Sequence, residues 1–117
     1  MSIITKLKII VQNVIFNQQQ LLNESDIQKV LIGNLLAIQI KQKGIVKDFE
    51  EIEFKVFSQW GDDGIIQYLI HHIGIPNKTF IEFGVESYIE ANTRFLLLND
   101  NWSGLIMDGS TDHINTV

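Results

Sequence analysis

The sequence predicts an α/β protein in which N-terminal helices precede the first β-α-β unit of a parallel sheet. Two short apolar runs, residues 79–84 and 104–109, are rich in strand-forming residues, and each ends with an acid close to a glycine. Helical patterns precede, separate and follow these runs, and such alternation is typical of parallel α/β sheets. The connection from Glu82 to Asp108 has the length of one right-handed crossover.

The composition is that of a globular protein, with 45% apolar and 20% charged residues among 117. The formal net charge is -5 and there is no basic run, so nucleic acid is not expected as the main partner. No cysteine is available for disulfides or thiolate metal sites. No apolar stretch reaches the ~20 residues that cross a bilayer, and Lys6 and Lys8 interrupt the N-terminal one. We therefore expect no membrane span and no secretory signal, and a cytoplasmic location.

Two amphipathic helices are predicted in the N-terminal third of the chain. Apolar residues recur at helical spacing from Ile3 to Ile15, which predicts a first helix over residues 3–17. The amide-rich tract that follows predicts a fraying end or a turn. Ser25 with Gln28 three residues later has the pattern of a capping box, so a second helix is expected to begin there and to end near Gly44.

These helices and the connector after them make up a segment of residues 1–56 that precedes the sheet. Two roles stay open for the helices, a lid or docking segment on a catalytic domain, or an extension that only packs. A membrane-surface role is disfavoured, because the polar face of the first helix carries mainly amides rather than basic groups. A short strand is expected near residues 52–56. The connector also carries an acidic patch typical of a solvated face, formed by Asp48, Glu50, Glu51 and Glu53.

Residues 57–117 supply the alternating elements. A short helix is expected after the turn-forming residues that follow Phe57, and Gly74 and Pro76 end it. The run at 79–84 is expected to be a buried parallel strand. The next helix is expected over the sequence ANTRFLLLND, with three inward-facing residues, Phe95, Leu96 and Leu98. A second strand and the beginning of a further helix complete the chain.

The residues at the two strand ends indicate a ligand site. Ligands of open parallel sheets bind beyond the carboxyl ends of the strands. After the first strand, Gly84 lets the backbone approach a ligand closely, and Glu82 suits a cationic or amine-bearing group. At the end of the second strand, Asp108 can accept the hydroxyl hydrogens of a ribose. Together these residues predict a nucleoside cofactor with a charged tail.

A dinucleotide is disfavoured at this site. Its binding turn needs three glycines in the pattern G-x-G-x-x-G, so that a pyrophosphate can reach a helix N-terminus. Here Gly84 is followed by the sequence VESYI, so the second and third glycines are missing. Glu86 would also bring negative charge toward a phosphate. A sulfonium cofactor with an amino-acid tail is compatible with these residues.

Three strings of the sequence, FSQWGDDGIIQYLI, TFIEFGVESYIEANTRFLL and NWSGLIMDGS, resemble the N-terminal part of FkbM-like methyltransferases. These are class I enzymes that use S-adenosylmethionine. The resemblance covers roughly residues 57–114, about half of the chain. The acid-x-glycine piece alone is weak, whereas the ordered set is moderately specific. The matching residues are Ser58, Gln59, Gly61, Asp62 or Asp63, Gly64, Glu82, Gly84, Asn92, Thr93, Trp102, Gly104, Asp108 and Gly109.

The resemblance implies that residues 57–117 are the N-terminal half of a Rossmann-like domain that binds S-adenosyl-L-methionine. It implies methyl transfer to an oxygen of a glycan or small metabolite, with the methyl acceptor unknown. No catalytic residue and no metal ligand is predicted. Asp108 would hold the ribose, and Glu82, Gly84 and Val85 would line the methionine side. The full set of predicted cofactor-binding residues is Glu82, Gly84, Val85, Glu86, Asp108, Gln59 and Asp63, the last two closing over the site from the preceding helix.

The sequence also departs from the family pattern. Tyr88 stands where the family often has glycine, and it is expected to narrow the pocket, stack on a ligand or weaken the cofactor site. A class I methyltransferase needs about seven strands, and only two or three are predicted, so we expect a fragment without complete activity. A non-enzymatic module that pairs with another polypeptide is the alternative, and another nucleotide-binding enzyme is the third. A second copy or a partner chain is expected to cover the open sheet edge.

The main candidate residues also have purely structural interpretations. Glu82 is open to satisfaction by nearby backbone amides, and Asp108 to a role as helix N-cap or turn residue. His71 and His72 lie near a helix end, where an interaction with the helix C-terminus is favoured over metal binding. Of the two tryptophans, which are expected to pack, Trp60 is expected nearer to a ligand.

Overall fold

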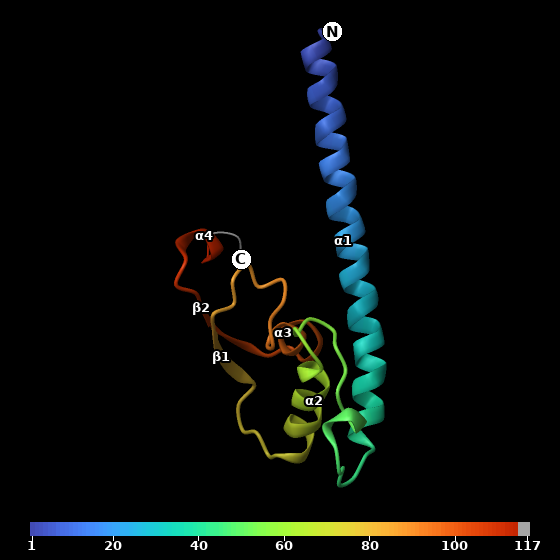
Figure 1. The fold of residues 1–117 in the computed structure, drawn as a ribbon, viewed down its shortest axis with the longest axis vertical. Coiled ribbons are helices and arrows are strands. Elements are labelled where there is room, and N and C mark those ends of the chain that lie inside the picture. Colours follow the sequence, from blue (N-terminus) through green and yellow to red (C-terminus); the bar gives the residue numbers. More distant parts are fainter. Residues whose placement is uncertain (115–117) are drawn as a thin grey trace.

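The structure is a computed structural model that describes the backbone of residues 1–114 and the side chains of residues 1–17 and 23–112. Figure 1 shows one long helix beside a small α/β body, which is formed by the described residues after the helix, 42–114. The elements in chain order are α1 (Ile3–Lys41), the 3-10 helix η1 (Phe49–Glu51), α2 (Asp62–His72), β1 (Thr79–Phe83), α3 (Arg94–Asp100), β2 (Ser103–Met107) and α4 (Thr111–Ile114).

The N-terminal region is a single helix of 39 residues, so the predicted break after residue 17 is wrong. Ser2 caps this helix, and its Oγ accepts a hydrogen bond from the backbone N–H of Thr5 at 3.2 Å. Ser25 lies inside the helix and not at a cap. The amide tract weakens the apolar pattern without breaking the helix, because glutamine is itself a good helix former. The helix ends at Lys41, close to the predicted stop at Gly44.

The C-terminal half of α1 packs on the body through a close approach at Gly33. A methyl group at this position would meet side-chain atoms of Val56 at 2.6 Å and of Phe95 at 2.9 Å. Val56, Phe57 and Phe95 form a buried cluster, and Val30 of α1 packs against it. One core therefore joins α1 to the segment around Val56 and to α3, which carries Phe95.

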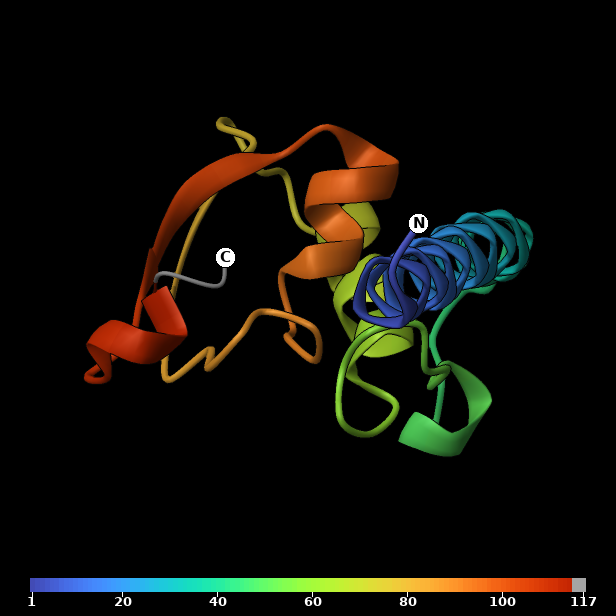
Figure 2. The ribbon, with the colours of Figure 1, turned by 90° about the horizontal axis from the view of Figure 1, so that it is seen from above.

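Figure 2 shows three layers, with α1 on one side, α2 and α3 in the middle and the sheet beyond them. The two strands pair in parallel, with Thr79 opposite Ser103 and Phe83 opposite Met107, and α3 connects them. The predicted α/β class, the helix now seen as α2, both strands and α3 are confirmed. Within the described residues, no helix is long and apolar enough to cross a membrane.

The strand predicted near residues 52–56 does not form. This segment has no strand, and η1 precedes it. The backbone N–H groups of Val56, Phe57 and Ser58 all donate to the carboxylate of Asp63. The N–H groups of Ile52 and Glu53 donate to the carbonyl oxygen of Phe49, so most donors of the segment with a known acceptor are used outside a strand ladder.

Burial of the strands and of α3 differs from the prediction. One face of the sheet is exposed, with Ile81 at 68% and Phe83 at 78% relative exposure, so β1 is not buried on both faces. Phe95 and Leu96 face inward as predicted, whereas Leu98 is 47% exposed. In the last turn of α3 it is Asn99 and Asp100 that face the other helices, through hydrogen bonds from Asn34 and Gln67, so these two polar residues occupy the inward positions rather than Leu98.

Candidate functional site

A hollow of about 600 Å³ lies at the carboxyl end of β1. This volume falls within the range of roughly 300–1,000 Å³ that is usual for small-molecule sites. The loop between β1 and α3 forms most of its wall, and Gln59 reaches it from the segment before α2. The lining residues are Gln59, Glu82, Phe83, Gly84, Val85, Glu86, Ser87, Ile89, Glu90, Ala91 and Asn92. The structure therefore brings together all predicted site residues except Asp63 and Asp108.

Gly84 leaves the backbone of this hollow accessible. Its φ of +71° lies in the left-handed region that favours glycine. A Cβ at this position would meet no atom within 4 Å, so the space beside the backbone is open. The N–H of Gly84 donates to the carbonyl oxygen of Met107 at 2.8 Å, which ties the turn to the end of β2.

Glu82 is held by the loop that leads into α3. Its Oε1 accepts from the N–H of Asn92, and its Oε2 accepts from the N–H of Thr93, each at 3.0 Å. The Thr93 hydroxyl also donates to Oε2. Nearby backbone amides therefore satisfy the Glu82 carboxylate, as its structural interpretation predicts. The side chain still lines the hollow, and a carboxylate offers about four acceptor positions, so these three bonds leave it able to accept from a ligand.

Asp108 connects β2 to the same loop. Its Oδ2 accepts from the N–H of Glu86, and its Oδ1 accepts from the N–H of Ser110, both at 2.8 Å. The second bond, to the residue two positions later, is the one expected if Asp108 is a turn residue. Asp108 thus lies next to the wall of the hollow without being one of its lining residues.

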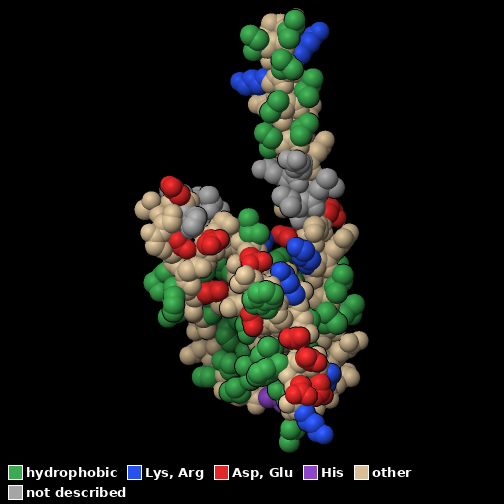
Figure 3. Space-filling model, in the orientation of Figure 1, with side chains coloured by type: hydrophobic (Ala, Val, Ile, Leu, Met, Phe, Trp, Pro, Cys, Tyr) green, Lys and Arg blue, Asp and Glu red, His purple; other side chains and the backbone are tan. Residues whose placement is uncertain are grey.

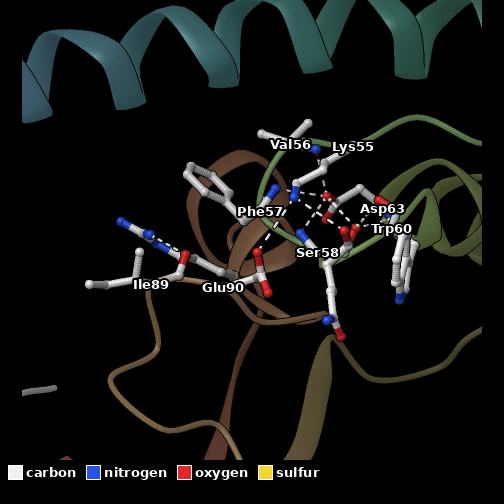
Figure 4. Close-up of polar contacts among 10 residues, drawn as sticks. Lys55, Val56, Phe57, Ser58, Trp60, Asp63, Ile89 and Glu90 are labelled. Carbon is white, nitrogen blue, oxygen red and sulfur yellow. Dashed lines mark hydrogen bonds and ion pairs between the residues drawn. The ribbon is translucent and has the colours of Figure 1, made fainter.

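Asp63 has a different place from the one predicted. It is 1% exposed, and its Oδ2 accepts from three successive backbone N–H groups at 2.7–2.8 Å and from the hydroxyl of Ser58 at 2.8 Å. Figure 4 shows this carboxylate enclosed by the segment that carries Val56, Phe57 and Ser58. It fixes the connector onto the first turn of α2, and it does not reach the hollow.

Tyr88 packs beneath the loop, where it contacts Val85 and Ala91, and it does not line the hollow. Its hydroxyl lies 2.9 Å from Oγ1 of Thr93, and burial raises the pKa of the phenol. The backbone at this position has a φ of +60°, a conformation that glycine adopts without strain. A left-handed φ favours glycine, which is the residue that the FkbM-like pattern often has at this position. The packing of Tyr88 beneath the loop does not depend on any of the three predicted effects, which are a narrowed pocket, stacking on a ligand and a weakened cofactor site.

Arg94 was not singled out from the sequence, yet it joins α1 to the wall of the hollow. One guanidinium nitrogen donates to Asp26 of α1 at 2.7 Å, and the other donates to the carbonyl oxygen of Ile89 at 2.6 Å. The guanidinium also lies 4.3 Å from the ring centre of Phe57. No local pattern could have revealed this link, because Asp26 and Arg94 are 68 positions apart.

A second, smaller hollow of about 360 Å³ lies on the other side of the same loop. Ile89 and Glu90 line both hollows, and the Glu90 carboxylate forms an ion pair with Lys55 at 3.4 Å. Figure 4 shows Ile89 and Glu90 beside Phe57 and Lys55. Sequence reasoning missed both residues, because neither belongs to a strand end or a recognisable motif.

The histidines and tryptophans have structural surroundings. Nδ1 of His72 lies 2.8 Å from the carbonyl oxygen of Tyr68, at the C-terminal end of α2, as expected. Trp102 is buried, whereas Trp60 is 71% exposed and does not line the hollow. Among the residues that the structure describes, no group of three or more acidic or histidine side chains is arranged to hold a metal ion.

Comparisons with protein-family models, with curated proteins and with solved structures find no significant match to this chain. The functional assignment therefore rests on the residues of the hollow. Three glutamates and no lysine, arginine or histidine line it. Such a lining favours a ligand that carries positive charge and disfavours a phosphate.

Proposed function

We propose that this chain belongs to an S-adenosylmethionine-dependent methyltransferase and contributes the first β-α-β unit of a Rossmann-like cofactor-binding domain. One observation carries the proposal. The carboxylate of Glu82, near the end of β1, lines an open hollow of suitable size, and the carboxylate of Asp108, after β2, accepts from the backbone of the glycine loop that forms its wall. Such folds bind their cofactors beyond the carboxyl ends of the parallel strands.

The charge of the hollow supports a sulfonium compound over a dinucleotide. Glu82, Glu86 and Glu90 line it, and only the last of these has a cationic partner, Lys55, among the described residues. S-adenosylmethionine carries positive charge on its sulfur and on its amino group, whereas a pyrophosphate would face unpaired carboxylates. The exposed backbone at Gly84 allows the amino-acid tail to approach closely.

The residues present fit the cofactor, and each has a defined task. Glu82 is oriented by the amides of Asn92 and Thr93, and it would accept from the amino group of the methionine part. Asp108 is oriented by the amides of Glu86 and Ser110, on the side where the ribose would lie. When bound, the cofactor would supply an activated methyl group, and these side chains would hold it in a fixed orientation.

Calorimetric titration of the full 117-residue chain tests the proposal. S-adenosylmethionine and S-adenosylhomocysteine are expected to bind in the micromolar range, and NAD is not. Glu86→Gln removes one negative charge from the lining while leaving the backbone bond to Asp108 in place. One charge at about 4 Å in water is worth about 1 kcal/mol, so this variant should bind S-adenosylmethionine roughly five-fold more weakly.

Glu50→Gln is the matched control, because Glu50 is an exposed residue of the connector that does not line the hollow. Its affinity should equal that of the wild type. A folded sample that binds neither S-adenosylmethionine nor S-adenosylhomocysteine would overturn the proposal. Equal weakening by the two substitutions would show that binding is not located at this hollow.

A further inference from the structure

The long helix α1 carries a heptad pattern that its packing on the body does not use. In a seven-residue repeat abcdefg, coiled coils place apolar residues at a and d. Starting from Ile4 as a, the pattern runs through five heptads to Leu35, and seven of the ten core positions are apolar. The a positions are Ile4, Val11, Gln18, Ser25 and Ile32, and the d positions are Leu7, Val14, Leu21, Gln28 and Leu35.

The a and d positions form the seam of the repeat, and their described apolar side chains are all exposed. Relative exposure lies between 52% and 79% for Ile4, Leu7, Val11, Val14, Ile32 and Leu35. Figure 3 shows apolar side chains along the N-terminal part of α1, where the helix extends beyond the body. An apolar stripe of this length on a helix in water needs a partner surface.

The body occupies the opposite side of the helix. The residues of α1 that are buried against it are Gly33, Ala37 and Ile40, and Val30 packs on the core cluster. In the same repeat these residues fall at b and f, which point away from a and d. A second helix along the seam would therefore lie opposite these buried residues, whereas the flanking positions Lys29 at e and Leu31 at g also line hollows between α1 and the body.

The shape of the chain supports a dimer. Its accessible surface is 8638 Å², against about 6,500 Å² for a compact folded monomer of this mass. The excess, about 2,100 Å², includes the open face of the sheet as well as α1, and it exceeds the ~800 Å² that each partner contributes to a standard interface. The radius of gyration is 18.4 Å, against about 13 Å for a compact chain of 117 residues.

Charge at the flanking positions favours a parallel pair of copies. In parallel coiled coils a g residue faces the e residue five positions further along the partner helix. Glu24 is at g and Lys29 is at e, so Glu24 of one copy would face Lys29 of the other. In the single chain, Nζ of Lys29 lies 6.0 Å from the ring centre of Phe57. The remaining g–e pairs bring no like charges together. Branched residues at a with leucine at d also favour two parallel strands.

We infer that two copies of this chain associate through α1 as a parallel two-stranded coiled coil over residues 4–35. The inference is independent of the cofactor proposal, because the seam and the hollow share no residue. A lipid surface is disfavoured as the partner of the stripe, since the polar face of the N-terminal half carries only Lys6 and Lys8 among amides and hydroxyls. The polar positions Gln18, Ser25 and Gln28 would set the register at a cost in stability.

Sedimentation equilibrium of the full chain over a range of concentrations tests the inference. The expected mass is about 27 kDa, twice the 13.4 kDa of one chain. Ile4→Glu and Ile32→Glu should each raise the dimer dissociation constant at least ten-fold. The matched controls are Ile9→Glu and Ile27→Glu, which place the same charge at exposed f and c positions and should leave the constant unchanged. Circular dichroism establishes that each variant is still helical.

Disulfide trapping reports the direction of the pair, because the chain has no native cysteine. Val11→Cys at an a position should cross-link to its own counterpart on mild oxidation, and Ile9→Cys at f should not. A 13.4 kDa species at every concentration would overturn the inference. So would equal effects of the seam and control substitutions, or a monomer that co-sediments with anionic lipid vesicles. A trapped dimer lost in Ile4→Glu would establish it.

Discussion

Replacement of Asp63 by alanine is expected to lower the free energy of unfolding of the body markedly. This carboxylate is almost fully buried, and its Oδ2 alone accepts the N–H groups of Val56, Phe57 and Ser58 and the Ser58 hydroxyl. Alanine would leave the three backbone donors without an acceptor, whereas the Ser58 hydroxyl could still donate to the carbonyl oxygen of Trp60 at 3.0 Å. The connector would then lose the group that holds it against α2.

The size of the effect follows from these contacts. A buried donor left unsatisfied costs about 1–3 kcal/mol, so three donors at the low end give about 3 kcal/mol. The other oxygen of Asp63, Oδ1, is buried without a hydrogen-bond partner among the described residues. Removing it returns part of that cost, so we expect a net loss of about 2–3 kcal/mol. Domains of this kind have a total free energy of unfolding of about 5–15 kcal/mol.

Urea unfolding followed by circular dichroism measures this loss, with Asp62→Ala as the control. Asp62 lies in the same first turn of α2 and forms no side-chain hydrogen bond among the described residues. Its removal should cost only the helix-dipole contribution, about 0.3–1 kcal/mol. If the two variants unfold within 1 kcal/mol of each other, the bonds to Asp63 do not hold the connector and the reasoning fails.

Three further outcomes are expected. Gly33→Ala should lower the free energy of unfolding by about 1–3 kcal/mol, because the new methyl group has no room between α1 and the core, whereas Gly44→Ala with open space around it should change little in thermal unfolding. Burial raises the pKa of Tyr88 in the folded protein. The wild type should therefore lose stability relative to Tyr88→Phe as the pH rises above about 10, the pKa of an unfolded tyrosine, and through the raised value. Identical dependence of stability on pH in the two proteins would contradict this. The backbone N–H groups that Glu51 accepts lower its pKa, so carbon-detected NMR should find it titrating below an unstructured glutamate, with its contribution to stability lost as the pH falls through that lowered value.

The sequence was most informative where a local pattern decides the structure. Strand ends, turn glycines and apolar periodicity located β1, β2, α2 and α3 within a few residues. The hollow was also anticipated in part, because residues at the carboxyl ends of parallel strands share one edge of the sheet. Glu82, Gly84, Val85, Glu86 and Gln59 do line it.

What the sequence did not reveal depends on partners distant along the chain or on competing local effects. The continuity of α1 was missed because an apolar pattern reports burial, and glutamine keeps a helix intact while lowering that pattern. Asp63 was assigned to the ligand, since a carboxylate beside a turn looks the same from sequence whether it accepts from a cofactor or from the backbone. The exposure of β1 depends on what covers the sheet, which periodicity alone does not reveal.

The link between Asp26 and Arg94 has a consequence for the order in which the molecule assembles. The strands pair between residues 79 and 103, only 24 positions apart, whereas this link closes a span of 68 positions. With the usual logarithmic growth of loop-closure entropy, the longer closure costs about 0.9 kcal/mol more chain entropy. We therefore expect the link between Asp26 and Arg94 to close after the strands have paired, whereas the contact of Gly33 with Val56, which are 23 positions apart, closes a span as short as that of the sheet.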